Sequence, residues 1–377
     1  MKSLLFTPLK IRDLEIRNRI VLSPMLQYSC EGGHVNDWHL THLTKFAAAG
    51  VGLVFVESTK VDPRGCSTSR DPGLWKDDYI EPLARIAANI KQHGAAAGIQ
   101  LSHSGRKGRR ALPWEGRVPL QAVPLVDGGG AWELIGPSAI AHSPRSATPR
   151  AMTLDDIRDV VTAWGDAADR AHRAGFDVVE IHGGHGYLIH QFLSPLANQR
   201  TDEYGGSREN RMRFAVEVAR EVRRRWPAGK PLFYRISAVD GAGWAIEDSV
   251  ALARALKQAG VDVVDCSSGG MSEVADSEIL SPLGYQVPYA EAVKAGADVR
   301  SMAVGMIIHP EQAEAILREG KADLVALGRE LLHNPHWALS AAQALGEDEP
   351  FRHVARQYAF WLEKRWKKNQ APAQHPA

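Results

Sequence analysis

Apolar and polar residues alternate at the start of the chain and predict short extended strands there. Residues 5–24 keep this alternation on both sides of the turn-forming pair Arg12-Asp13. We therefore predict a β-hairpin that plugs one end of a larger fold. The apolar run Ile20–Leu22 then predicts the first buried strand, which ends at Ser23-Pro24.

After this strand one unit recurs: an amphipathic helix, a glycine or another small residue, and a short strand that is apolar throughout. The clearest helix covers residues 154–174, with apolar side chains at helical spacing behind a Thr153-x-x-Asp156 capping box. Similar phrases at Gly175, Gly260 and Lys321 mark equivalent joints between a helix and the next strand. The predicted strands are 20–22, 51–57, 97–101, 178–181, 232–237, 261–266, 301–304 and 324–327.

This repeat predicts the fold class. Strands that are apolar on both faces indicate a parallel sheet covered by helices, and eight of them indicate a closed (β/α)8 barrel, a single domain over residues 1–348. A doubly wound open sheet is the alternative. It is less favoured because no Gly-x-Gly-x-x-Gly turn follows any early strand.

Two stretches depart from the repeat. Residues 108–150, after the third strand, are rich in Pro, Gly and Trp, and we expect them to form a long capping loop over the mouth of the barrel. The tail, residues 349–377, carries Tyr358-Ala-Phe-Trp361 among basic residues. We expect residues 357–362 to dock on another surface and residues 367–377 to be frayed.

Composition narrows the function classes. A chain of 377 residues with 44% hydrophobic content has enough apolar material for a large core, and a net charge of +1 offers no field for nucleic acid or a membrane surface. Cys30, Cys66 and Cys266 are too few for a disulfide framework, a four-cysteine zinc site or an iron–sulfur cluster. The N-terminal apolar run is too short for a signal peptide. We expect a soluble, cytoplasmic protein.

The candidate chemistry gathers at the carboxyl ends of the predicted strands, where barrels of this class carry their active sites. The fourth strand runs into the loop Glu180–Leu188, in which His182, His185 and Tyr187 could donate to one oxygen atom. We expect the glycines of this loop to let a substrate come close. Other strand ends contribute Ser23–Tyr28, Glu57–Thr59, Gln100–Lys107, Arg235 with Ser237, Val304–Met306 and Leu327–Arg329.

Two features indicate a phosphorylated, ring-bearing cofactor. Gly305 and Gly328 follow the last two strands, the usual phosphate site of this fold, and Arg329 adds a cation. Arg235 lies within an apolar strand and needs an anionic partner. That partner is either a protein carboxylate or the pyrimidine edge of a flavin, to which Gln100 would offer a complementary amide.

At this point the motifs resemble those of a known family. They are Leu5-Phe-Thr-Pro8, Asn18-Arg-Ile-Val21, Ser23-Pro-Met25, Gly98-Ile-Gln-Leu101, His103-Ser-Gly-Arg-Lys107, Pro137-Ser-Ala-Ile140, His182-x-x-His185-Gly-Tyr-Leu188, Arg200-Thr-Asp-Glu-Tyr-Gly-Gly-Ser207 and Gly328-Arg-Glu-Leu-Leu332. Together they resemble the Old Yellow Enzyme family of FMN-dependent ene-reductases, in the branch of the thermophilic-like enzymes and xenobiotic reductase A. The resemblance implies tightly bound FMN, NADPH or NADH as reductant, and an enone-type small molecule as substrate.

The resemblance also implies a role for each matching position. Residues that would touch the flavin are Ser23, Pro24, Met25, Leu26, Ser58, Gln100 and Arg235, and those that would hold its phosphate are Gly305, Met306, Gly328 and Arg329. His182 and His185 would bind the substrate carbonyl, Tyr28 would help to position it, and Tyr187 would donate the proton. In Arg200–Ser207 the residues themselves favour a structural role, a turn whose Ser207 caps the next helix.

Two positions depart from the pattern of that branch. Leu26 stands where the branch has a cysteine that contacts flavin and substrate, so we expect a more apolar pocket with no thiol chemistry there. The chain also lacks the arginine with which some members reach into a neighbouring subunit. Trp361 is our candidate for that role, in a homodimer or homotetramer.

Two other functions stay open. A metal-dependent hydrolase of the same fold could use His103, His182 and His185 as ligands, although these loops offer no obvious carboxylate ligand. A flavin-binding storage or sensor protein would keep the phosphate site without needing Tyr187. We do not expect one of the related dienoyl reductases, because they carry an iron–sulfur cluster and an extra dinucleotide domain, for which this chain has too few cysteines and too few residues.

Overall fold

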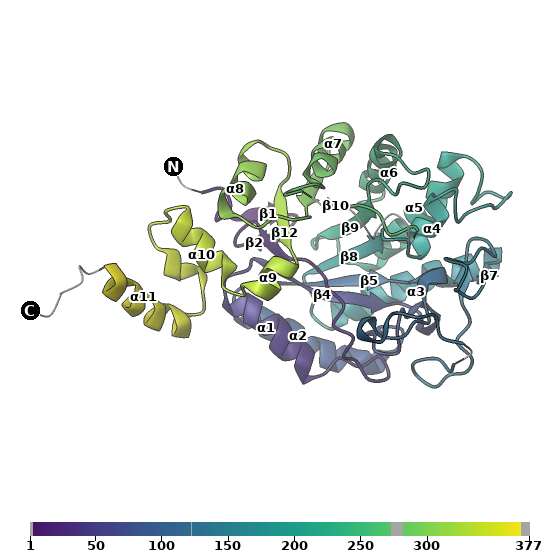
Figure 1. The fold of residues 1–377 in the computed structure, drawn as a ribbon, viewed down its shortest axis with the longest axis horizontal. Coiled ribbons are helices and arrows are strands. Elements are labelled where there is room, and N and C mark those ends of the chain that lie inside the picture. The colour runs from purple at the N-terminus through teal and green to yellow at the C-terminus, as the bar shows by residue number, and fades with distance from the viewer. Residues whose placement is uncertain (1–2, 122, 273–281, 371–377) are drawn as a thin grey trace, which may run out of the picture.

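The computed structural model describes residues 3–121, 123–272 and 282–370. Within them, eight parallel strands close into a barrel in the spatial order β10-β11-β12-β3-β4-β5-β8-β9 (Figure 1). These strands are β3 (Ile20–Leu22), β4 (Leu53–Lys60), β5 (Ala96–Ser102), β8 (Val178–Gly183), β9 (Leu232–Ser237), β10 (Val263–Ser267), β11 (Arg300–Ala303) and β12 (Leu324–Leu327). The predicted (β/α)8 barrel is confirmed, and the open doubly wound sheet is wrong.

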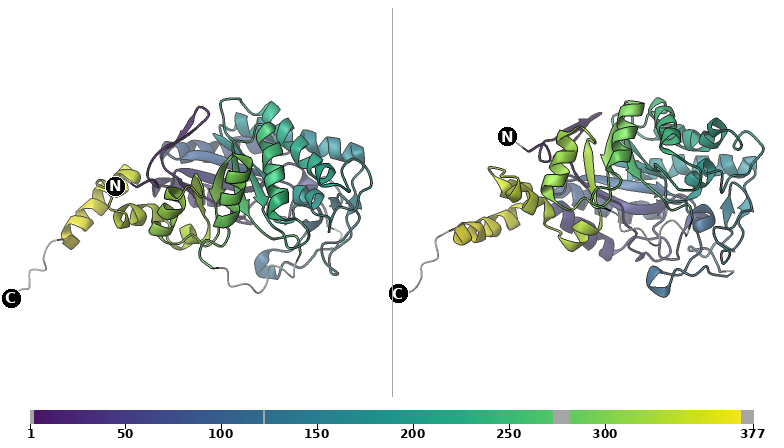
Figure 2. Two further views of the ribbon diagram at one scale, coloured as in Figure 1. Left: turned by 90° about the horizontal axis from the view of Figure 1, so that it is seen from above. Right: turned by 45° about the horizontal axis from the view of Figure 1, so that its top comes forward.

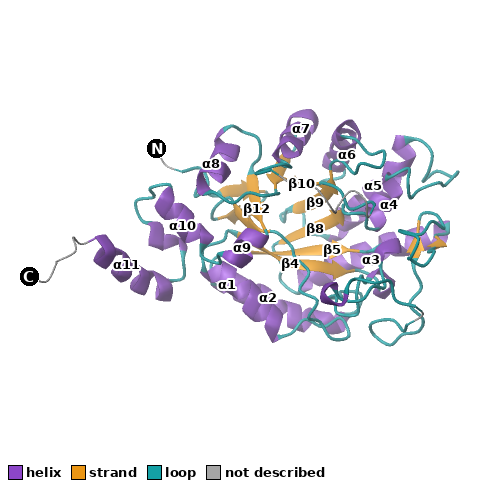
Figure 3. Cartoon of the chain, viewed as in Figure 1, coloured by secondary structure: helices purple, strands orange, loops and turns teal. Residues whose placement is uncertain are grey.

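Helices cover the outside of the barrel (Figure 3). The longer ones are α1 (Asp37–Ala48), α2 (Ile80–Gln92), α3 (Leu154–Arg173), α5 (Arg208–Arg225), α6 (Ile246–Gln258), α7 (Val287–Ala297), α8 (Pro310–Arg318), α10 (Trp337–Ala344) and α11 (Arg356–Gln370), and the short ones are α4 (Leu188–Leu193) and α9 (Arg329–His333). Thr153 and Asp156 form the predicted capping box of α3, with Thr153 Oγ1 accepting from the Asp156 amide at 3.1 Å. Ser207 caps α5 by accepting from the Asn210 amide.

The N-terminal hairpin lies where the pattern placed it. Strands β1 (Leu9–Ile11) and β2 (Leu14–Ile16) pair antiparallel around Arg12-Asp13. Ile11 and Ile16 are fully buried in one cluster with inward-facing strand residues such as Phe55 and Phe233. The hairpin therefore closes the amino-terminal end of the barrel and leaves the carboxyl ends of the strands for the site.

Strand β4 is longer than predicted and irregular at a decisive place. It continues to Lys60, and its register against β5 shifts between the pairs Val56–Ile99 and Thr59–Leu101, so that one extra residue is accommodated. Before this bulge, Leu53 and Phe55 face the barrel interior. Beyond it, the even-numbered Ser58 and Lys60 face inward, because a bulge re-aims the side chains that follow it. Ser58 thus lies in the strand, whereas the prediction placed it in the loop beyond the strand.

The described residues of the stretch 108–150 are mostly irregular, with a short 3-10 turn at Pro113–Glu115 and the two-residue strands β6 (Ile135–Gly136) and β7 (Arg150–Ala151). Trp132 and Leu134 are buried and anchor it on Cys66, while Trp114 is 68% exposed. At the other end, α11 projects from the barrel (Figures 1 and 2). Residues 356–370 are helical, so the frayed tail expected from residue 367 is wrong up to residue 370, and the remainder lies outside the described residues. No helix in the described part of the chain has the length and apolar character needed to cross a bilayer.

Candidate active site

Two cavities meet at Pro24 at the carboxyl ends of the strands. The first, of about 490 Å³, is lined by Ser23, Pro24, Met25, Arg235, Gly305, Met306, Gly328 and Arg329. The second, of about 330 Å³, is lined by Pro24, Leu26, Tyr28, Ser58, Gln100, His182, His185 and Tyr187. The fold thus brings every predicted site residue except Trp361 to this mouth. Trp361 lies on α11, 67% exposed, and lines neither cavity.

His182 and His185 form a hydrogen-bonded pair on one wall of the second cavity. His182 Nε2 lies 3.3 Å from His185 Nδ1, and His185 Nε2 lies 2.7 Å from Ser267 Oγ. The Ser237 hydroxyl accepts from the His185 amide at 2.8 Å and holds this backbone at a φ of +55°. A non-glycine residue in the left-handed region costs of order 1 kcal/mol and persists only where the surroundings impose it.

Burial keeps both imidazoles neutral. It lowers the pKa of His182 and of His185 well below the ordinary range, and neighbouring positive charge on Arg235 adds to the effect. Neutral imidazoles still carry one N–H each, so the pair can donate hydrogen bonds to an oxygen atom. Because they carry no extra proton, the two histidines are hydrogen-bond donors rather than strong acids in this site.

Tyr187 stands beside this pair and keeps its proton. Its ring lies edge-on to His182, with the ring centroids 5.0 Å apart. Burial and the carboxylate of Asp71 raise the pKa of Tyr187 to about 12. The phenol is therefore protonated near neutral pH and is the group on this wall with a proton to give.

The glycines of the loop serve a different purpose from the one predicted. A Cβ on Gly184 would lie 2.8 Å from the Ser237 backbone nitrogen, and one on Gly186, at a φ of +70°, would collide with the carbonyl of Gly270. These glycines let neighbouring backbone pack against the loop. The expectation that they admit a substrate is corrected accordingly.

Arg235 has its protein partner inside the barrel. Its Nε lies 3.2 Å from Asp265 Oδ2, and its Nη1 donates to Ser23 Oγ at 2.8 Å. Gln100 donates to Glu180 Oε1 at 2.9 Å in the same layer, where burial and the nearby Asp265 raise the pKa of Glu180 to about 8. Asp265 is therefore the carboxylate partner of Arg235. The Arg235 guanidinium also borders the first cavity, where it can face an anionic group of a ligand.

Sequence reasoning missed several residues that shape these cavities. Lys107 donates to the carbonyls of His185 and Gly270 at 2.8 and 2.7 Å, and Arg117, from the 108–150 stretch, donates to the Tyr28 hydroxyl at 3.0 Å. Ser267 orients His185. Lys107 stands inside a recognised motif, and Ser267 follows an apolar strand, so both carried a usable signal. Arg117 carried none.

Comparisons with known proteins identify the family of the chain. The sequence profile described as the NADH:flavin oxidoreductase / NADH oxidase family matches residues 4–348. An NADPH dehydrogenase from Geobacillus sp. (strain WCH70) is 47% identical over 350 residues, which cover 92% of this chain and 96% of that protein. The NADPH dehydrogenase of Bacillus subtilis (strain 168) is 43% identical over the same shares.

The chain belongs to the NADH:flavin oxidoreductase / NADH oxidase family. It is thus an oxidoreductase of the Old Yellow Enzyme type, as the motifs predicted. The solved structure of morphinone reductase has a TM-score of 0.75 at 26% identity, with coverage of 91% of this chain and 90% of that one. The structure of a 2-naphthoyl-CoA reductase has a TM-score of 0.81 at 26% identity, and this chain spans about half of that protein, 53%.

The cofactor of this family fits the residues present. FMN needs cationic or amide donors for its phosphate, and Gly305, Gly328 and Arg329 border the first cavity. Positive charge near its ring suits a flavin, and Arg235 lines the same cavity. The combined space falls in the usual range for cofactor pockets, roughly 300–1,000 Å³. The residues of both cavities therefore suit FMN, with NAD(P)H as the reductant.

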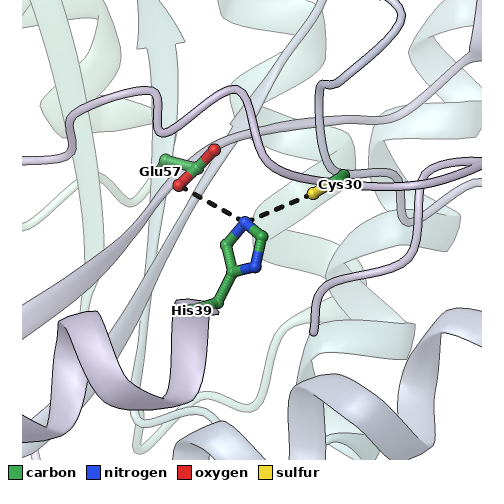
Figure 4. Close-up of side chains that lie close together, drawn as sticks. All are labelled: Cys30, His39 and Glu57. Carbon is green, nitrogen blue, oxygen red and sulfur yellow. Dashed lines mark hydrogen bonds and ion pairs between the residues drawn. The ribbon is translucent and has the colours of Figure 1, made fainter. Parts of the chain in front are cut away.

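The hydrolase alternative loses its support in this family and in this geometry. His103 turns its Nδ1 to the Gly105 amide at 3.0 Å. In the part of the chain that the structure describes, one set of donor atoms converges as metal ligands do, and it is Cys30, His39 and Glu57 (Figure 4). His103, His182 and His185 form no such set among those residues.

The Cys30–His39–Glu57 cluster is satisfied by protein contacts. His39 Nε2 lies 3.3 Å from Cys30 Sγ and 3.8 Å from Glu57 Oε2 (Figure 4). Glu57 Oε1 accepts from the Gln27 amide at 3.0 Å. Because residue 27 directly follows Leu26, the cluster anchors the loop that lines the second cavity.

Proposed function

We propose that the protein reduces the carbon–carbon double bond of α,β-unsaturated carbonyl compounds, with NADPH or NADH as the reductant. One observation carries this proposal: His182, His185 and Tyr187 share one wall of the cavity, two as neutral donors and one as a protonated phenol. An enone needs both kinds of group, donors at its oxygen and an acid at its α-carbon. Bound FMN would supply the hydride chemistry that links the nicotinamide to the β-carbon of the substrate.

His182 and His185 bind the carbonyl oxygen of the substrate. In the His182–His185 contact one ring nitrogen donates to the other, and His185 Nε2 is hydrogen-bonded to Ser267 Oγ; an entering oxygen takes over the N–H donors of the pair. Donors that are already in place stabilise the negative charge that develops on that oxygen, at about 3 kcal/mol for a well-placed donor. Tyr28 borders the same cavity and helps to orient the substrate, with its own hydroxyl held by Arg117.

Tyr187 protonates the α-carbon. The phenolic O–H bond breaks, a C–H bond forms at the α-carbon, and solvent water later returns a proton to the phenolate. General-acid steps of this kind typically contribute a hundredfold or more, roughly. A storage or sensor protein would have no use for this group.

The cofactor extends across both cavities in this proposal. We propose that Ser23, Pro24, Met25, Leu26, Ser58 and Gln100 line the flavin ring, and that Gly305, Met306, Gly328 and Arg329 hold the phosphate. Arg235 supplies positive charge to the ring where electron density accumulates on reduction. Met306 adopts a φ of +50°, and this backbone conformation supports a precise placement of the phosphate loop.

We further propose that the enzyme is a homo-oligomer in which α11 docks on a second copy. Tyr358, Phe360 and Trp361 are 46%, 53% and 67% exposed on this projecting helix. Exposed aromatic clusters commonly mark interfaces. In this arrangement Trp361 reaches the site of the neighbouring subunit. Trp361→Ala should shift the species measured by light scattering toward the monomer, and an unchanged mass would contradict this assignment.

The cysteines support a reducing, cytoplasmic location. Cys30, Cys66 and Cys266 are buried and unpaired as thiols. Exposure to an oxidising compartment would favour disulfides in a stable secreted protein. Fractionation of the native host with detection of this protein tests the assignment, and recovery outside the cytoplasm would contradict it.

A colour change tests the activity. The purified protein should be yellow, should bleach under nitrogen on addition of NADPH, and should regain its colour when cyclohexenone is added. Stopped-flow absorbance separates these two half-reactions. A flavin that bleaches but does not recolour with any enone would sink the proposal and leave the storage or sensor alternative.

A further inference from the structure

A lysine is fully buried beside the proposed proton donor. Lys60 has no solvent exposure, and its Nζ donates to Ser58 Oγ at 2.7 Å. Its second polar contact is Asp71 Oδ2 at 3.5 Å. The same Nζ lies 5.1 Å from the centre of the Tyr187 ring. A buried ammonium is costly unless it is paired, so a lysine at this place calls for a reason.

Asp71 connects Lys60 to the hydroxyl of Tyr187. Asp71 Oδ2 accepts from the Ser67 hydroxyl and from the Ser67 amide, both at 2.6 Å. The Ser67 side chain in turn hydrogen-bonds to Tyr187, and both residues line a small cavity next to the site. One continuous path therefore runs from Lys60 through Asp71 and Ser67 to the phenol.

The charge of Asp71 works against the reaction unless it is neutralised. When Tyr187 gives up its proton it becomes a phenolate, and a carboxylate two hydrogen bonds away repels it. Asp71 already raises the pKa of Tyr187, whereas Arg110 and Arg117 on the 108–150 stretch lower it. At short range in a poorly solvated site, one uncompensated charge shifts such an equilibrium by a pKa unit or more, roughly.

We propose that Lys60 is a positioning residue for the protonation step: its ammonium neutralises Asp71, and so keeps Ser67 bonded to Tyr187 without adding net negative charge beside the phenolate. This inference rests on the proposed function, in which Tyr187 protonates the α-carbon. Ser58 is the other polar partner of the Lys60 ammonium. It lines the second cavity together with Tyr187 and accepts a hydrogen bond from this ammonium.

The bulge in β4 makes this arrangement available. Without the extra residue between Val56 and Thr59, Lys60 would point away from the barrel interior and toward the surrounding helices. With it, Lys60 faces Tyr187 from the neighbouring side of the mouth. The network is therefore a feature of the assembled strand ends and not of any one loop.

Lys60→Met is the direct test, because it keeps the length of the side chain and removes the charge. We expect flavin reduction by NADPH to be nearly unchanged and the enone half-reaction to slow about tenfold, the equivalent of one pKa unit in the donor. The solvent deuterium isotope effect on the enone half-reaction should rise, since proton transfer becomes slower. Lys76→Met is the matched control, because Lys76 Nζ also lies 5.1 Å from a tyrosine ring, that of Tyr79, away from both cavities.

A double variant that removes both charges is the second part of the test. Adding Asp71→Asn to Lys60→Met should restore most of the enone rate, because neither charge then remains. Equal slowing of both half-reactions, or no rescue by the double variant, would overturn the inference. If Lys60→Met binds no flavin, Ser67→Ala tests the same path without altering charge and should slow the enone half-reaction alone; an unchanged rate overturns the inference. Wild-type enzyme that fails to oxidise with enone would instead reject the proposed function.

Discussion

The end of strand β4 places two buried ionisable residues, three positions apart, in opposite surroundings. Glu57 turns outward to α1 and meets Cys30 and His39 in a sealed cluster, which contains no permanent cation (Figure 4). Lys60 turns inward to the mouth and meets Asp71, a carboxylate beside the cavity. Both are buried, so burial alone does not separate their roles.

The difference lies in what each side chain faces. The Glu57 side supports a loop through the Gln27 amide, and burial raises the pKa of Glu57 to about 8, so that the group stays largely neutral. On the Lys60 side, its hydrogen-bond partner Ser58 and the ring of Tyr187 line a space of about 330 Å³ into which a reactive molecule can enter. The buried polar cluster on one face of the strand therefore supports a loop. The cluster on the other face lies beside a cavity that a substrate can enter, and can therefore take part in the reaction.

The largest effect should come from the cavity side. Tyr187→Phe removes the proton donor and leaves the ring in place. We expect the enone half-reaction to slow by about a hundredfold or more, with flavin reduction nearly intact. Stopped-flow measurement of each half-reaction checks this. Equal loss in both would mean that Tyr187 shapes the cavity without donating a proton.

A substitution in the Cys30–His39–Glu57 cluster should lower the stability of the fold. Glu57→Ala leaves the Gln27 amide without its acceptor in the protein interior and removes the carboxyl group that lies 3.8 Å from His39. We expect the free energy of unfolding to fall by roughly 1–3 kcal/mol, measured by urea denaturation of the FMN-loaded enzyme. Cys30→Ala in the same cluster should cost less, because a thiol is a weak hydrogen-bonding group. A Glu57→Ala enzyme with unchanged stability but lost turnover would contradict the assignment of a structural role to the Glu57 side of the strand.

A change in the pH dependence of stability is expected on the same sealed side of the strand. Glu57 has an ordinary pKa of 4.5 and a folded pKa of about 8, so the unfolded chain releases this proton first as pH rises. Its contribution to stability is therefore full below pH 4.5 and is lost as pH rises toward 8. Glu57→Gln cannot ionise and keeps the acceptor for Gln27.

The measured quantity is the difference in unfolding free energy between Glu57→Gln and wild type at several pH values. That difference should move in favour of the variant between pH 4.5 and 8. Glu180, whose pKa is also raised to about 8, titrates in both proteins and cancels. A difference that stays constant with pH would show that Glu57 is ionised in the folded enzyme.

Much of the fold could be predicted because local patterns carried it. The eight strands appeared as short apolar runs, and Thr153 and Ser207 appeared as helix caps, since hydrogen bonds to the first turn depend on residues three positions away. Helices α7, α10 and α11 were not predicted. α7 and α10 are short and rich in alanine, and α11 is largely exposed, so the apolar periodicity of each is weak.

Some residues of the site could also be predicted from the sequence, and others could not. Residues next to strand ends, such as His182, Gln100 and Arg329, could be collected in advance, because a parallel barrel brings all its carboxyl ends to one face. Arg117 could not, since it comes from the irregular stretch 108–150. Lys60 and Asp71 had no signal either, because an isolated lysine and aspartate in a sequence look like surface residues.

The order of apolar runs, the strand-end loops and the family motifs by themselves determined a flavin-binding barrel with His182, His185 and Tyr187 at its mouth. Only the tertiary structure decided which way the side chains beyond Val56 face, because one extra residue in β4 reverses the alternation and register is a relation between two strands. It also decided that Arg235 pairs with Asp265, and that Lys60 lies beside Tyr187, 127 positions away in the chain. Such pairings depend on closure of the barrel, which no local stretch encodes.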